Sequence, residues 1–158
     1  MDADTFIVST YDHERPVRTI DLQGNMGEVQ HKLLPDKEYG LFYSACTYIS
    51  SSNTLVFSDM DQDTVYMCDV ASGEGHVIKS DKIVSPRGAC AGPAGTVFVC
   101  SGATGTLVQL SQDGEILMTH DIDMESPYAV SLNRDCTRQV VSNSQEGQNI
   151  IKLFKLWS

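Results

Sequence analysis

Three aspartates, Asp59, Asp61 and Asp63, alternate with other residues in the run DMDQDT. Alternating carboxylates are the ligands with which many calcium-binding loops begin. Such a loop also needs glycine at its sixth position and glutamate at its twelfth, where this chain has Thr64 and Val70. We therefore interpret the run as a solvated loop and expect no metal site.

Five cysteines and four histidines are the other side chains that could bind a metal or attack a substrate. The number of cysteines is odd and no CxxC spacing occurs, which argues against a disulfide framework and against a zinc site. No GxSxG, GxGxxG or P-loop motif is present. A Ser–His–Asp triad is assembled in space, and nothing in the sequence points to one. We therefore expect no catalytic residue, no cofactor and no enzymatic activity.

The composition is that of a folded chain with an acidic surface. The 158 residues are 41% hydrophobic, and 21 acidic against 11 basic residues give a formal net charge of −10. Such a charge repels a phosphate backbone, so we expect no nucleic-acid partner. No stretch approaches the ~20 apolar residues of a membrane helix, and the N-terminus has no signal-peptide pattern. These features predict a cytoplasmic protein without membrane association.

An internal repeat organises the sequence. The runs TLVFSD (54–59), TVFVCS (96–101) and RQVVSN (138–143) begin 42 residues apart and share an apolar core with a small or polar end. Further apolar runs lie before and after each of them, and Gly, Asn, Asp and Ser separate the runs as tight turns require. Four short strands in about 42 residues are typical of one blade of a β-propeller. We predict an all-β propeller with about three four-stranded blades per chain.

We expect residues 1–158 to form one partial propeller domain. Residues 5–22 are interpreted as the third and fourth strands of a split blade, followed by an insertion at residues 24–38. The predicted blades then comprise residues 41–80, residues 85–122 and a C-terminal partial blade at residues 126–156.

Three segments of the sequence resemble NHL repeats, whose pattern runs from Pro-x-Gly through a glycine and an apolar strand to Val-x-Asp and a polar loop. The segment SPRGACAGPAGTVFVCSGATGTLVQL (85–110) has this order, and NTLVFSDMDQDTVYMCDV (53–70) supplies Val56 and Asp59. SPYAVSLNRDCTRQVVSNSQEGQNIIKLF (126–154) keeps the proline and has Asn143 at the place of the aspartate. The segment DHERPVRTIDLQGN (12–25) is similar to propellers of tripartite-motif (TRIM-like) proteins.

The resemblance implies that the residue after Ser-Pro lies near the rim of the central channel, on the ligand-binding face. Arg87 and Tyr128 occupy this place in successive repeats. Arginine binds carboxylates with two parallel hydrogen bonds, tyrosine offers a ring with a polar tip, and both are enriched at binding hot spots. In the alternative interpretation Arg87 pairs with an aspartate, Tyr128 packs on Pro127, and neither binds a ligand. The predicted binding residues at the rim are Arg87, Tyr128, Asp59, Asp61, Asp63 and Asn143.

The resemblance further implies a protein-interaction module that recruits partners or substrates, as the propellers of TRIM-like ubiquitin ligases do. An RNA-binding NHL propeller and a carbohydrate- or small-ligand-binding propeller are the alternatives. Metal-dependent lyases and lactonases have similar propellers, but the histidines of this sequence do not fall where they would converge. Three blades leave open sheet edges, and NHL-type rings usually have six blades. We therefore expect a homodimer that closes a six-bladed ring, with a longer parent chain as the alternative.

Overall fold

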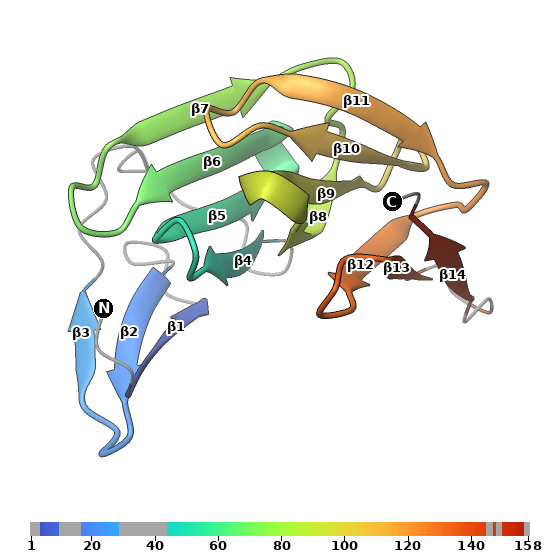
Figure 1. The fold of residues 1–158 in the computed structure, drawn as a ribbon. Helices are drawn as coiled ribbons and strands as arrows, with labels where there is room; N and C mark the ends of the chain where they lie inside the picture. Colours follow the sequence, from blue (N-terminus) through green and yellow to red (C-terminus); the bar gives the residue numbers. More distant parts are fainter. Residues whose placement is uncertain (1–3, 10–16, 29–43, 145–146, 148–149, 157–158) are drawn as a thin grey trace.

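The computed structural model describes residues 4–9, 17–28, 44–144, 147 and 150–156, and these form small antiparallel sheets in sequence order (Figure 1). The first sheet holds β1 (Thr5–Ser9), β2 (Val17–Asp21) and β3 (Met26–Glu28). The second holds β4 (Ser44–Ile49), β5 (Thr54–Asp59), β6 (Thr64–Asp69) and β7 (Gly75–Lys79). The third holds β8 (Pro86–Ala91), β9 (Val97–Ser101), β10 (Thr106–Leu110) and β11 (Ile116–Asp121). The fourth holds β12 (Pro127–Leu132), β13 (Arg138–Asn143) and β14 (Ile151–Lys155).

Each sheet is a simple meander, and successive sheets stand side by side around a common centre. The first strand of each sheet contacts the first strand of the next: β1 contacts β4, β4 contacts β8, and β8 contacts β12. The last strands β7 and β11 run along the outer margin of the fan (Figure 1). The all-β architecture of repeated sheets that the 42-residue period predicted is confirmed.

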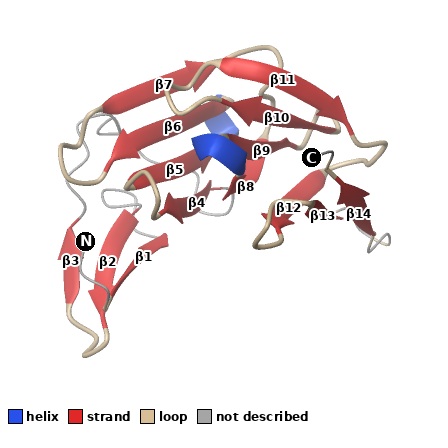
Figure 2. Cartoon of the chain, in the orientation of Figure 1, coloured by secondary structure: helices blue, strands red, loops and turns tan. Residues whose placement is uncertain are grey.

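Strands are almost the only regular structure in the described segments (Figure 2). The two helical elements there are single 3-10 turns at Met60–Gln62 and Pro93–Gly95. Neither has the length or the hydropathy of a helix that crosses a membrane.

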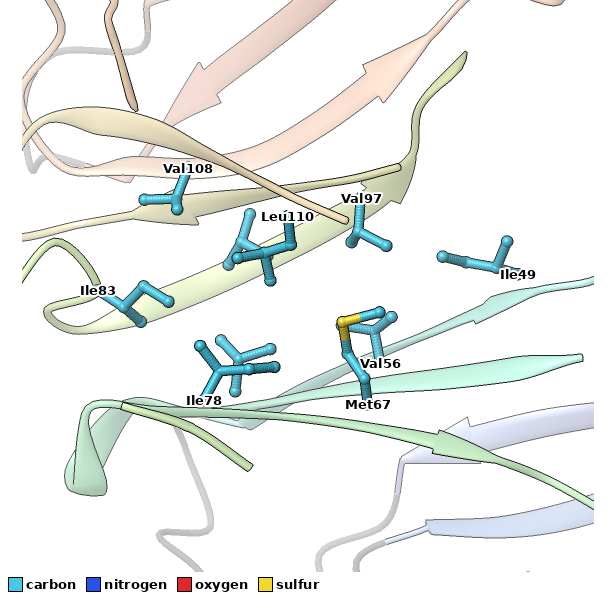
Figure 3. Close-up of a cluster of buried hydrophobic side chains, with 10 residues drawn as sticks. Ile49, Val56, Met67, Ile78, Ile83, Val97, Val108 and Leu110 are labelled. Carbon is cyan, nitrogen blue, oxygen red and sulfur yellow. The ribbon is translucent and has the colours of Figure 1, made fainter. Parts of the chain in front are cut away.

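The core lies between neighbouring sheets. Side chains from the second and third sheets interdigitate in the largest cluster, which includes Val56, Met67, Val97 and Leu110 (Figure 3). A second cluster joins the first sheet to the second, and a third joins the third sheet to the fourth. The middle sheets are thus covered on both faces, which explains why every residue of β5 and β9 is buried. The strands β13 and β14 instead alternate between more buried and more exposed residues.

The N-terminal sheet differs from the interpretation of residues 5–22 as the last two strands of a blade. The strand β3 pairs with β2 through Arg18–Glu28, Thr19–Gly27 and Ile20–Met26, so β2 is the middle strand of three. The run Met-Gly-Glu is too short and too polar to be recognised as a strand without its partner. The rest of the predicted insertion lies outside the described residues.

Candidate functional site

Arg87 and Tyr128, the two residues that follow Ser-Pro in successive repeats, lie together in the structure. Arg87 is in β8 and Tyr128 is in the neighbouring strand β12. The guanidinium carbon of Arg87 is 5.5 Å from the centre of the Tyr128 ring, a distance at which the cation is attracted to the face of the ring. Tyr128 remains 47% exposed. A cation and an exposed aromatic ring therefore form one continuous surface on two adjacent strands.

Local irregularities of both strands position this pair. The pairing of β8 with β9 shifts register between Pro86 and Ala89, and the pairing of β12 with β13 shifts between Pro127 and Ala129. Bulges of this kind redirect side chains at functional edges of sheets. The preceding repeat has Ala45 at the place of Arg87, and its strand β4 pairs without a shift. The arrangement is therefore specific to the third and fourth sheets.

Gly88 allows β8 and β12 to approach closely beside the pair. A Cβ atom on Gly88 would lie 2.8 Å from the carbonyl oxygen of Tyr128 and 3.1 Å from the Cα atom of Ala129. Both are backbone atoms of the next sheet, so they cannot move without moving β12. Only a residue without a side chain fits here, and the contact between the two strands holds Arg87 against Tyr128.

Two of the three aspartates around the turn after β5 accept hydrogen bonds from backbone amides. The buried Asp59 accepts a hydrogen bond from the Gln62 amide at 3.2 Å and caps the turn. Asp63 has a left-handed backbone (φ 50°) and accepts a hydrogen bond of 2.7 Å from the Ser85 amide at the start of the third sheet. Asp61 is exposed in the turn. Within the described segments, no group of three or more His, Cys, Asp or Glu side chains is placed to hold a metal ion.

Asn143 lies at the same end of the fourth sheet as Tyr128, directly opposite Pro127. Its side-chain Oδ1 accepts a hydrogen bond of 2.9 Å from the backbone amide of Ile150, and its backbone amide donates to the Ile150 carbonyl oxygen at 3.2 Å. The side-chain Nδ2 is buried and has no hydrogen-bond partner within the described part of the chain. Asn143 therefore anchors the connection between β13 and β14, at the end of the sheet where Pro127 precedes Tyr128.

Burial suppresses the reactivity of three cysteines. Removal from water, with a smaller contribution from Asp69, raises the pKa of the Cys68 thiol to about 11. Burial likewise raises the pKa values of Cys90 and Cys100 to about 12, with smaller contributions from Cys136 and Cys90 respectively. These thiols are protonated at neutral pH, and a protonated thiol is a poor nucleophile.

The structure has a cleft of about 520 Å³ between the third and fourth sheets, which the sequence did not predict. Among the residues that line it are His120 and Gln139, which stand 42 residues after Ile78 and Val97. Ile78 and Val97 are both part of the apolar core between the second and third sheets. Gln139 is only 4% exposed, and its Nε2 has no hydrogen-bond partner among the described residues. The sequence does carry one indication of this cleft: a glutamine stands at a position that is apolar in the preceding repeats.

Replacing Gln139 by leucine is expected to raise the free energy of unfolding by about 1–2 kcal/mol, since it removes a buried donor without a partner and keeps the volume of the side chain. Urea denaturation followed by circular dichroism measures the change. Gln109 is the matched control, because its amide contacts Thr96 Oγ1 at 3.4 Å and His120 Nε2 at 3.3 Å. Gln109→Leu loses these contacts and should not stabilise the protein. A destabilised Gln139→Leu variant would contradict the prediction.

Comparison with known proteins relates the chain to solved structures only. No family model and no curated protein matches the sequence. A structure of Kuenenia stuttgartiensis hydrazine synthase is similar with a TM-score of 0.74 and 20% identity, over 98% of this chain and 43% of that chain. Selenomethionine-substituted virginiamycin B lyase from Staphylococcus aureus is similar with a TM-score of 0.66 and 14% identity, over 99% of this chain and 54% of that chain.

A catalytically inactive variant of the same lyase with quinupristin gives a TM-score of 0.67 and 16% identity, over 99% of this chain and 53% of that chain. This chain therefore spans about half the length of the structures that it resembles. Identities of 14–20% relate folds and not activities. Together with the repeated meander sheets, the similarity shows that the chain has a β-propeller fold, as the repeat predicted.

Proposed function

We propose that this chain is a non-enzymatic protein-recognition module whose anchor is the Arg87–Tyr128 pair. The observation that carries the proposal is the placement of an arginine over a tyrosine ring that is 47% exposed, on two adjacent strands whose register shifts at that point. Arginine and tyrosine are among the residue types enriched at the centres of protein interfaces. A propeller is a rigid support for such an anchor, because its strands are held by neighbours on both sides.

The chemistry of the pair favours a ligand segment with a carboxylate. A guanidinium can donate two parallel hydrogen bonds to a carboxylate, and the ring beside it offers apolar area at a small entropic cost. The chain as a whole has a formal net charge of −10, so basic residues around the ligand carboxylate would be attracted to the protein. We therefore propose that the module binds peptide segments in which an acidic residue is flanked by basic residues.

In its finer form the proposal is that the module selects substrates, as the propellers of TRIM-like ubiquitin ligases do. The resemblance of residues 53–70, 85–110 and 126–154 to NHL repeats supports this form. The absence of enzymatic activity is part of the same proposal. The raised pKa values of the Cys68, Cys90 and Cys100 thiols support one part of it, namely that these three cysteines do not act as nucleophiles.

The proposal is tested by selecting peptides from a random display library on the wild-type protein and measuring their affinities by fluorescence anisotropy. Arg87→Ala is expected to weaken the selected peptides at least about tenfold, which corresponds to about 1.4 kcal/mol. Arg87→Lys keeps the charge but loses the two-pronged geometry and should be nearly as weak. Arg134, exposed in the turn after β12, is the control arginine, and its replacement by alanine should leave the affinity unchanged. Equal binding by Arg87→Ala, or selective retention of RNA at low salt, would refute the proposal.

A further inference from the structure

The outward face of the N-terminal sheet carries an apolar row. Ile7 and Val17 of this sheet face inward and pack against the second sheet. Side chains alternate along a strand, so Phe6 and Ile20 face the opposite way. Phe6 stands opposite Ile20, which stands opposite Met26, and these pairings join the three side chains across β1, β2 and β3. Phe6 and Met26 are each 55% exposed.

The outward face of the C-terminal sheet is apolar in the same way. Val141 is buried in the cluster against the third sheet, and Phe154 packs on that cluster. Val140 and Leu153, their neighbours along the strands, stand opposite each other and point away from that cluster. Val140 is 37% exposed, Leu153 is 66% exposed, and Ile151 further along β14 is 72% exposed.

The middle sheets show what normally covers such faces in this chain. In β9, Val97 and Val99 pack into the cluster with the second sheet, while Phe98 and Cys100 pack into the cluster with the fourth. A sheet of this fold is therefore stable with apolar side chains on both faces because another sheet lies against each face. The two end faces have the same kind of side chains as the covered faces, and no sheet of the described residues lies against them.

We infer that a second copy of the chain covers both end faces, with the N-terminal face of each copy packed against the C-terminal face of the other. The chain matches 43–54% of the length of similar structures, so two copies supply about the length of one such structure. Two copies contribute twice the sheets of one chain, and the total is within the range of about 4–8 blades of known propellers. In the inferred pairing each end sheet remains a separate blade. The six-bladed ring expected from three blades per chain would instead require the end sheets of the two copies to merge into one blade.

This pairing joins two different faces, so it can close a ring only if both contacts form at once. Each contact should resemble the packing between neighbouring sheets within the chain, in which alternate side chains of facing strands interdigitate. The surface is separate from the Arg87–Tyr128 pair, and it can therefore be tested without any ligand.

The solution mass of the 158-residue chain tests the inference, measured by light scattering after size-exclusion chromatography. The wild-type protein should have twice the mass of the 17.3 kDa chain. Phe6→Asp and Leu153→Asp each place a charge in one half of the contact, and each should reduce the mass to that of one chain. Leu117→Asp is the matched control, because Leu117 is 51% exposed on the outer strand β11 and belongs to neither end face. Circular dichroism verifies that each variant is folded.

A mixture of the two monomeric variants distinguishes this pairing from a symmetric one. The intact N-terminal face of Leu153→Asp can bind the intact C-terminal face of Phe6→Asp, so the mixture should form a complex of two chains that neither variant forms alone. The inference is overturned by a wild-type protein with the mass of one chain, by folded variants that remain dimeric, or by a mixture that stays monomeric. None of these results bears on peptide binding at Arg87, so the two proposals can fail independently.

Discussion

Replacing Gly88 with alanine is expected to lower the free energy of unfolding by about 1–3 kcal/mol and to abolish peptide binding at the Arg87–Tyr128 pair. The new Cβ atom would lie 2.8 Å from the carbonyl oxygen of Tyr128 and 3.1 Å from Cα of Ala129. Relief of this overlap requires β12 to move away from β8, and this movement separates the guanidinium from the ring. The substitution therefore connects the packing of two sheets directly to the candidate site.

Urea denaturation measures the loss of stability, and the affinity for a selected peptide measures the loss of the site. Gly27→Ala is the matched control: its Cβ atom would approach the Thr19 hydroxyl at 2.5 Å, and a hydroxyl at the end of a side chain can rotate away. We expect a smaller loss of stability and unchanged binding for this control. Unaltered binding by a folded Gly88→Ala protein would show that the close approach of the two strands does not position the pair.

The repeat contained most of the information about the fold. Three similar runs at a spacing of 42 residues located β5, β9 and β13 within a residue of their observed bounds. For β5 and β9 the prediction succeeded because strands covered on both faces are nearly continuous apolar runs between turn residues. The strand β13 alternates between buried and exposed residues, and the 42-residue spacing located it. The strand β3 could not be found in this way, since Met26–Glu28 is held by its pairing with β2 and not by its own composition.

The candidate site was predictable only where the repeat itself placed residues together. Arg87 and Tyr128 hold one position in successive repeats, and equal positions in neighbouring blades lie side by side. The contacts of Asp59 and Asp63 were not predictable, because a loop carboxylate can face solvent or a backbone amide, and only the folded chain decides which. The burial of Gln139 was not predictable for a similar reason, because it depends on the third sheet that lies against this side chain.

Replacing Phe57 with alanine is expected to lower the free energy of unfolding by about 3–5 kcal/mol, the largest effect on stability among these substitutions. Phe57 is 1% exposed at the centre of β5, and its ring centre lies 6.2 Å from that of Tyr66 at a tilt of 47°. The same cluster contains Val17 of β2, so the ring is part of the contact that holds the first sheet against the second. Its removal leaves a cavity between the first and second sheets, and the backbone of these packed sheets cannot move enough to fill it.

The consequence should be local as well as global. A domain of this size is stable by about 5–15 kcal/mol, so the variant would keep a reduced margin and could lose the first sheet before the others. Urea denaturation measures the total loss, and hydrogen exchange compares the amides of β1 and β2 with those of β9 and β10. The control is Val77→Ala, because Val77 is 50% exposed on β7 and its truncation should cost less than about 0.5 kcal/mol. Equal acceleration of exchange in all four strands would mean that the first sheet does not open on its own. A decrease in the free energy of unfolding below about 1 kcal/mol would mean that the Phe57 ring does not hold the two sheets together.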